Sequence, residues 1–178
     1  LPYKSRHKEL PLAEIEKTIY EIDLLKTANY TIIGPLTTGL ILAGGSEQQQ
    51  QDIALFGEKI GIAFQIQDDI LGIFSDEIGK VKGSDIREYK QTLLFSRILK
   101  TIYKKEFLKI YGKDKLTEKN IEEIKELLIK SGSKQYAEDK MREYYQEGLS
   151  LLEKMSWIPK EKKQLLTGFV EYLKIRNK

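Results

Sequence analysis

Two adjacent carboxylates, Asp68 and Asp69, lie inside a long run that is otherwise apolar or amide-bearing. At the spacing of an α-helix, Gln65 and Gly72 share one face with the aspartate pair. Isoleucines form an apolar stripe on another face of the same predicted helix. That stripe consists of Ile62, Ile66, Ile70 and Ile73. The run therefore predicts a largely buried helix that carries two negative charges near its middle.

Carboxylates in apolar surroundings are costly unless cations neutralise them. Their oxygen atoms suit Mg²⁺, which keeps several waters and shares its coordination sphere with substrate phosphates. The alternative is a salt-bridged pair or a pair at a helix N-terminus, as on many protein surfaces. Placement in mid-helix between isoleucines argues against that alternative and favours a metal site.

Basic residues lie on both sides of the aspartate pair. Lys26 and Thr27 precede it, Gly79-Lys80 follows it, and Asp85 and Lys90 come next with four residues between them. A diphosphate ester ionises only if its departing oxygens are stabilised, which metal-holding carboxylates and ammonium groups can do. The sequence contains both kinds of group within a short stretch.

Together these motifs resemble the C-terminal half of the trans-isoprenyl diphosphate synthases, which make farnesyl and geranylgeranyl diphosphate. The motifs cover 12–90, and the resemblance continues to the end only as a helical pattern. It implies an Mg²⁺-dependent prenyltransferase that joins an allylic diphosphate to isopentenyl diphosphate, head to tail. Metal-assisted ionisation would produce a carbocation that alkylates the double bond, and pyrophosphate would take the proton.

The resemblance also assigns the metal ligands. Asp68 and Asp69 match the start of the family's second aspartate-rich motif, which implies that they bind Mg²⁺. Asp85 matches an aspartate that helps to hold the metal ions through water. The family often has a third aspartate where this chain has Gly72, so no metal ligand is expected at that position.

Residues for the substrates follow from the same resemblance. Lys26 and Lys80 match lysines that bind the allylic diphosphate, and Lys90 matches a third basic position near it. Thr27 and Gln65 match residues beside the reacting carbon, and Phe64 matches an aromatic residue near the homoallylic substrate. The implied catalytic residues are Lys26, Thr27, Gln65 and Lys80, and the implied substrate-binding residues are Lys26, Thr27, Phe64, Gln65, Lys80 and Lys90. Without the resemblance, packing in the core would explain Phe64, and exposure to solvent at the surface would explain the lysines.

The family's first aspartate-rich motif is expected before Leu1, as are the basic residues that bind isopentenyl diphosphate. We therefore expect 1–178 to be the C-terminal part of a single polyprenyl synthase domain, inactive by itself. The resemblance further implies that the complete protein is a homodimer.

Composition restricts the class of protein. The 178 residues are 40% hydrophobic and 32% charged, which is typical of a globular domain, and the net charge of +3 does not suggest nucleic-acid binding. The absence of cysteine excludes disulfides and thiolate metal sites and fits a cytoplasmic location. The longest apolar stretch, 30–45, is too short and too interrupted to form a transmembrane segment.

The pattern of apolar positions predicts an all-α fold with helices packed around a core. The family resemblance implies that this fold is a helical bundle of the isoprenoid synthase type, without its N-terminal helices. Ser46 and Gln49 form a predicted capping box, Pro35 should kink or restart its helix, and 75–83 should be a loop. The predicted helices cover 12–29, 31–43 (buried), 47–74, 88–104, 107–111, 117–129, 134–155 and 159–174.

Two other functions are consistent with such a pattern. One is a non-catalytic regulatory subunit or homologue of a prenyl diphosphate synthase, for which loss of the lysines and aspartates would be the sign. The other is a terpene cyclase, which pairs its aspartate-rich motif with an Asn/Ser/Glu metal motif. The aspartates and lysines are present and the second motif is not found, so a prenyltransferase is favoured.

Overall fold

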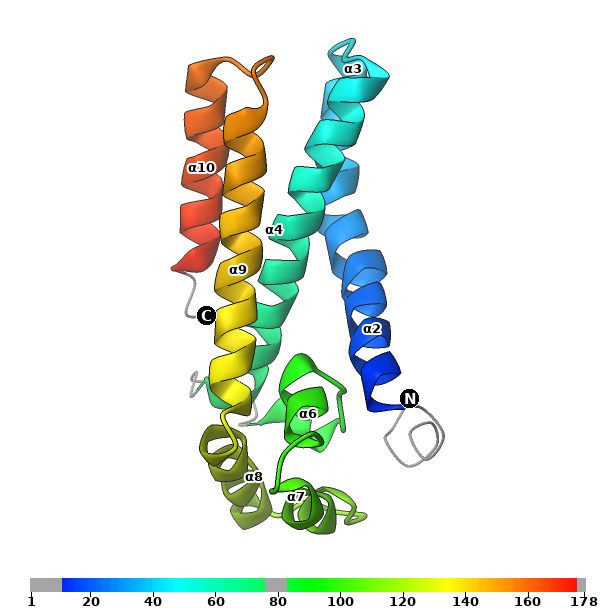
Figure 1. Cartoon of the computed structure of the whole chain (residues 1–178), viewed down its shortest axis with the longest axis vertical. Coiled ribbons are helices and arrows are strands. Elements are labelled where there is room, and N and C mark those ends of the chain that lie inside the picture. Colours follow the sequence, from blue (N-terminus) through cyan, green and yellow to red (C-terminus); the bar gives the residue numbers. More distant parts are fainter. Residues whose placement is uncertain (1–10, 76–82, 176–178) are drawn as a thin grey trace. The chain divides into compact units, whose positions relative to one another are not determined.

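The structure is a computed structural model that describes residues 11–75 and 83–175. Every regular element within these ranges is a helix, which confirms the all-α prediction (Figure 1). None of these helices is both long and apolar enough to span a membrane. The elements are α2 (Leu12–Asp23), η1 (Leu24–Ile33), α3 (Gly34–Leu42), α4 (Glu47–Phe74), α5 (Ser84–Arg87), α6 (Leu93–Ile98), α7 (Lys104–Tyr111), α8 (Glu118–Lys130), α9 (Ser133–Lys154) and α10 (Lys160–Lys174).

The chain divides into two compact units. The first unit contains Ile66–Asp139 together with the described residues up to Ile19. The second unit contains Tyr20–Gln65 and the C-terminal stretch from Lys140. Helix α4 contributes to both units, because it is unbroken from Glu47 to Phe74.

Helix α4 begins where the sequence predicts. The backbone N–H of Ser46 donates to Gln49 Oε1 at 2.8 Å, and the N–H of Gln49 donates to Ser46 Oγ at 3.3 Å. This reciprocal pair is the predicted capping box, and it satisfies two N–H groups that the first helical turn would leave without partners. The helix then continues through the aspartate pair, which confirms the mid-helix placement.

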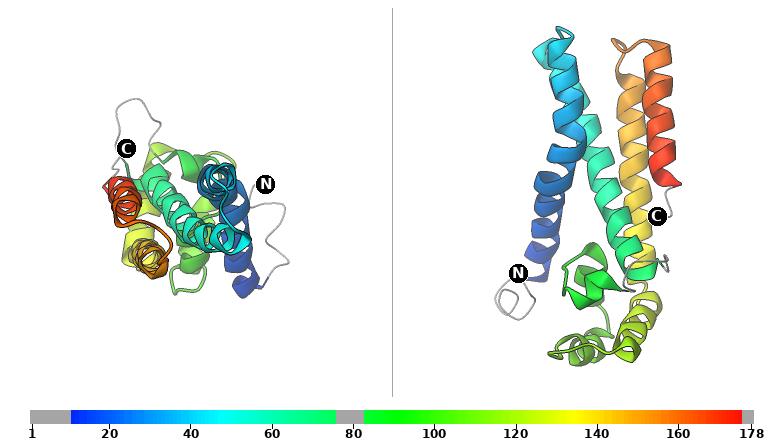
Figure 2. Two further views of the ribbon diagram at one scale, coloured as in Figure 1. Left: turned by 90° about the horizontal axis from the view of Figure 1, so that it is seen from above. Right: turned by 180° about the vertical axis from the view of Figure 1, so that it is seen from behind.

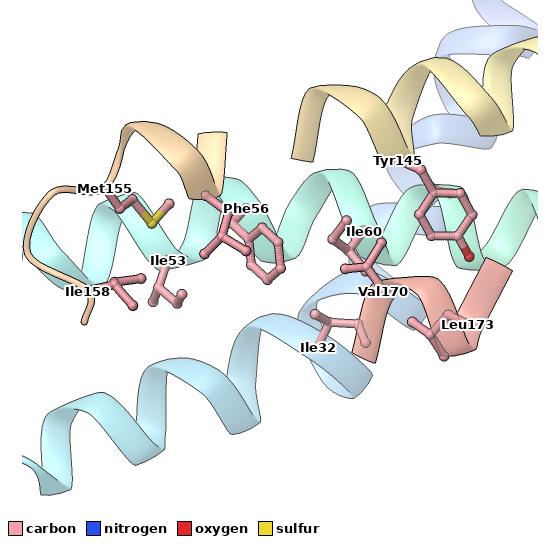
Figure 3. Close-up of a cluster of buried hydrophobic side chains, with 11 residues drawn as sticks. Ile32, Ile53, Phe56, Ile60, Tyr145, Met155, Ile158, Val170 and Leu173 are labelled. Atoms are coloured by element: carbon pink, nitrogen blue, oxygen red, sulfur yellow. The ribbon is translucent and has the colours of Figure 1, made fainter. Parts of the chain in front are cut away.

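The second unit is built on a cluster of buried apolar side chains (Figure 3). Phe56 and Ile60 of α4 pack there with Tyr145 of α9 and Val170 of α10, and each is at most 1% exposed. Burial of a side chain of this size contributes about 1.5–3 kcal/mol. Figure 2 shows α9 and α10 running side by side, and both contribute residues to this cluster.

Small residues bring η1 close to α4. A Cβ atom at Gly61 would lie 2.4 Å from Ala28 Cα, and one at Gly57 would lie 3.0 Å from Ile33 Cγ1. The glycines are four residues apart, so they form one face of α4, which we call the glycine face. Residues 24–33 of the facing segment form a π-helix, whereas the sequence pattern predicted an ordinary helix over 12–29. π-Helical geometry is rare and is frequent at functional sites.

Helix α3 corrects one prediction and confirms another. It restarts at Gly34 with Pro35 in its first turn, as expected. Its side chains are not buried, however, and Leu42 is 84% exposed. Leu36 and Leu40 pack against the core cluster of the second unit. The apolar composition predicted a buried helix, but the described residues bury its side chains only in part.

The prediction of one continuous helix over 88–104 is wrong. Thr92 has extended backbone angles, and α6 begins after it and ends at Ile98. A T-shaped aromatic pair in the first unit, Phe95 on Phe107 with ring centroids 5.0 Å apart, packs α6 against α7. The apolar spacing was compatible with a single helix, but contacts between the two shorter helices require a turn between them.

The glycine face generates a stability prediction. Replacing Gly61 by alanine should lower the free energy of unfolding by about 1–3 kcal/mol, because the new methyl group overlaps the Ala28 backbone. The control is Gly168→Ala in α10, where no atom lies within 4 Å of the added Cβ. That change should raise the free energy of unfolding by about 0.5–1 kcal/mol. Urea denaturation measures both, and an equal gain for the two variants would show that the close approach is absent.

Candidate functional site

Asp69, Asp85 and Lys90 form one cluster in the first unit, which we call the carboxylate cluster. The ammonium nitrogen of Lys90 lies 2.8 Å from Asp69 Oδ1 and 2.9 Å from Asp85 Oδ2. The side chains of Asp69 and Asp85 are 3% and 13% exposed, and that of Lys90 is 28% exposed. Two carboxylates from segments sixteen residues apart therefore converge on a single cation.

Electrostatics keeps this cation charged. Burial acts to lower the pKa of Lys90, but the charges and hydrogen bonds of Asp69 and Asp85 outweigh it and raise the pKa above the ordinary value for lysine. Lys90 is consequently an ammonium ion at neutral pH. The almost fully buried Asp69 thus has a full positive charge at hydrogen-bonding distance.

The backbone turn after α5 directs Lys90 toward the carboxylates. The N–H of Lys90 donates to the carbonyl of Asp85 at 2.9 Å, and the N–H of Tyr89 donates to the carbonyl of Ile86 at 3.1 Å. Tyr89 has φ of 54°, so it occupies the left-handed position that glycine normally fills in this helix-ending motif. That conformation costs a non-glycine residue about 1–2 kcal/mol.

Tyr89 is held in this conformation by its side chain. Its hydroxyl donates to the carbonyl of Lys113 at 2.6 Å. Its ring packs edge-on against Tyr111, with centroids 5.1 Å apart. No local sequence signal indicates this role, because a tyrosine at a left-handed position depends on contacts made more than twenty residues away.

Gly72 makes room for Asp85. A Cβ atom at residue 72 would lie 2.6 Å from Asp85 Cγ and 2.6 Å from Asp85 Oδ1. A side chain at position 72 would therefore displace the Asp85 carboxylate. The sequence interpretation assigned no role to Gly72, although a glycine within a helical pattern can indicate a close approach.

The carboxylate cluster suits a hard divalent cation. The described part of the chain contains no group of three acidic, histidine or cysteine side chains placed to hold a metal ion. Mg²⁺ is commonly bound by one or two carboxylates with substrate phosphates and water completing its shell. Two carboxylates already converge on one positive group, so the donor set fits Mg²⁺, and Asp68, half-buried on the same helix, is a further acidic residue.

A second group of predicted residues lies in the second unit. The hydroxyl of Thr27, on the π-helix, donates a short hydrogen bond to the side-chain carbonyl of Gln65 on α4. Both residues are buried, and Gln65 continues the glycine face by one helical turn. The structure therefore brings together Thr27 and Gln65, a contact that the sequence alone did not predict.

The remaining predicted site residues are placed as follows. Phe64 is half-buried and packs against the core cluster of the second unit. Lys26 is exposed on the π-helix. Lys80 and most of the predicted loop over 75–83 lie outside the described residues. Contact of these residues with substrate stays a prediction.

Comparison with known proteins gives consistent matches. A family model described as "Polyprenyl synthetase" matches residues 5–128. A geranylfarnesyl diphosphate synthase of Aeropyrum pernix is 31% identical over 137 residues, which is 76% of this chain and 43% of that protein. A geranylgeranyl diphosphate synthase of Methanosarcina mazei is 32% identical over 76% of this chain and 41% of that protein.

The fold matches as well. The crystal structure of geranylgeranyl pyrophosphate synthase from Corynebacterium glutamicum, complexed with isoprenyl diphosphate and magnesium, superposes with a TM-score of 0.79 at 32% identity. The match covers 98% of this chain and 48% of that one. The chain thus spans somewhat less than half the length of these relatives.

The buried contact between Thr27 and Gln65 can be tested by a double-mutant cycle. Thr27→Val should lower the free energy of unfolding by about 1–3 kcal/mol, because it leaves a buried carbonyl without this donor. The double variant Thr27→Val/Gln65→Leu should lose about 0.5–1.5 kcal/mol less than the sum of the single changes. Urea denaturation gives the three values, and strictly additive losses would contradict the hydrogen bond.

Proposed function

Because the chain belongs to the polyprenyl synthetase family, we propose that it forms the part of a trans-prenyltransferase that binds Mg²⁺ and the diphosphate of an allylic substrate. One observation supports this most directly: the carboxylates of Asp69 and Asp85 converge on a single positive charge. The same residues match the family's metal-binding motif by resemblance. In this proposal 1–178 is the C-terminal part of a single synthase domain.

The residues of the chain have distinct tasks in this proposal. Asp68, Asp69 and Asp85 hold Mg²⁺, which when bound stabilises the negative charge that develops on the departing diphosphate. Lys26, Lys80 and Lys90 bind the diphosphate oxygens, and the ammonium group is well suited to this because it has three donors on a flexible stem. Thr27 and Gln65 would lie beside the reacting carbon, with Phe64 near the homoallylic substrate.

The complete reaction is proposed from the relatives. Proteins that resemble this chain are named geranylgeranyl and geranylfarnesyl diphosphate synthases. We infer that the whole enzyme condenses an allylic diphosphate with isopentenyl diphosphate to give a short-chain trans-prenyl diphosphate such as farnesyl or geranylgeranyl diphosphate. We further propose that it is a cytoplasmic homodimer.

Ligand-dependent stabilisation tests the proposed site. Mg²⁺ with a non-hydrolysable allylic diphosphate analogue at 100 times its Kd should stabilise the folded chain by about 2.7 kcal/mol. For a chain of this size that raises Tm by roughly 5–10 °C. Asp68→Asn should lose this shift and, in the complete enzyme, lower turnover by at least about 100-fold.

The matched control is Asp139→Asn, which changes an exposed aspartate of α9 in the same way. It should keep the full shift in Tm and the full turnover. If Asp68→Asn also kept both, Asp68 would not be a metal ligand and the proposed site would be wrong.

Turnover by the 178-residue chain is a separate prediction. The purified chain, given Mg²⁺ and both diphosphates, should release no prenyl product. The family's first aspartate-rich motif is not among its residues, and Asp68, Asp69 and Asp85 supply only part of the charge stabilisation that ionisation requires. Product measured by mass spectrometry, from a sample free of longer species, would contradict this. A complete protein that binds both diphosphates but never turns over would instead support the regulatory subunit.

A further inference from the structure

We propose that Lys90 is the resident counter-cation of Asp69 and Asp85, and that it makes metal binding at this pair depend on the simultaneous presence of a diphosphate. This inference rests on the proposed function and adds an order of events to it. The two carboxylate oxygens that contact Lys90, Asp69 Oδ1 and Asp85 Oδ2, can ligate a divalent ion only after the ammonium group has left them. A diphosphate allows that departure because it offers the ammonium group other oxygens.

The first step of the argument is the need for a cation in the metal-free protein. Asp69 is 2% exposed, so water cannot stabilise its charge as it does at a surface. A buried carboxylate without a partner is strongly destabilising. Lys90 supplies that partner and, because it also contacts Asp85, neutralises one of the two negative charges in the pair.

The second step is that the same oxygens cannot serve both cations equally. Each carboxylate directs an oxygen at the Lys90 nitrogen from less than 3 Å. A divalent ion on those oxygens would bring two further positive charges next to the ammonium group, and repulsion is strong at such short range in a poorly solvated site. Lys90 therefore competes with a metal ion that arrives alone.

The third step is that the side chain can move while its backbone stays. The turn at Tyr89 and the hydrogen bond from the Lys90 N–H to the Asp85 carbonyl hold the backbone in place. The lysine side chain, by contrast, is a flexible stem of four carbons. Gly72 meanwhile leaves room for Asp85 against α4. Lys90 can consequently exchange the carboxylates for phosphate oxygens with both carboxylates still in position, as charge-assisted bonds to phosphate are strong.

The experiment titrates the folded chain with Mg²⁺ alone and with Mg²⁺ plus inorganic pyrophosphate, using isothermal titration calorimetry. In the wild-type chain, pyrophosphate should tighten Mg²⁺ binding by about tenfold or more. Lys90→Met should tighten the binding of Mg²⁺ alone by about tenfold. In this variant the additional gain from pyrophosphate should shrink.

The matched control is Lys59→Met. Lys59 is 26% exposed and lies 3.0 Å from Glu147 in the second unit, so it resembles Lys90 in burial and pairing but does not join two convergent aspartates. Its substitution should leave both titrations unchanged. Lys90→Gln is the second variant, because its amide can still donate to the carboxylates and so support folding without the charge.

The outcomes separate the two proposals. The role of Lys90 would be overturned if Lys90→Met and Lys90→Gln bound Mg²⁺ alone no more tightly than the wild-type chain does. It would also be overturned if pyrophosphate did not change the affinity of the wild-type chain for Mg²⁺. No Mg²⁺ binding by the wild-type chain, with or without pyrophosphate, would overturn the proposed metal site itself. Tighter binding in both Lys90 variants, with Lys59→Met unchanged, supports the inference.

Discussion

A carboxylate removed from water is costly unless a positive charge or hydrogen bonds stabilise it, and Asp69 imposes this constraint on the surrounding structure. Lys90 meets the requirement, but only because several other features place it there. The turn after α5 bonds the Lys90 N–H to the Asp85 carbonyl, Tyr89 accepts a left-handed conformation, and the missing side chain at Gly72 leaves room for the Asp85 carboxylate. The strain at Tyr89 and the open position at residue 72 thus serve one pair of ion contacts.

A steric constraint has the same importance in the second unit. Gly57 and Gly61 allow the backbone of η1 to lie against α4, and Ala28 is fully buried at the contact. The π-helical winding of this segment accompanies that contact and includes Thr27, which donates to Gln65. A rare helical geometry therefore occurs where the family resemblance places residues beside the reacting carbon, as π-helices often do at functional sites.

Gly72 shows how one departure from a family pattern can be explained physically. The family often has a third aspartate where this chain has glycine, and the resemblance alone indicates only the loss of a possible ligand. In the structure, the Asp85 carboxylate lies within 2.7 Å of where a Cβ at residue 72 would be. Glycine at 72 and the position of Asp85 are consequently linked, since a side chain at the first would displace the second.

The sequence by itself determined the features that depend on neighbours three or four residues apart. These include the capping box at Ser46, the restart of the helix at Pro35, the unbroken α4 and its buried isoleucine stripe. Each follows from local backbone hydrogen bonding or from the period of the apolar side chains. The family motifs also grouped Asp69, Asp85 and Lys90, whose side chains the structure brings into contact.

Only the tertiary structure decided how those residues meet. The break in the predicted helix over 88–104, the left-handed Tyr89, the π-helix at 24–33 and the exposure of Leu42 all depend on contacts with distant segments, or on their absence in the described residues. Helical periodicity states which side chains share a face but not how closely another backbone approaches it. For that physical reason the pairing of Lys90 with both aspartates could be recognised only once the chain was folded.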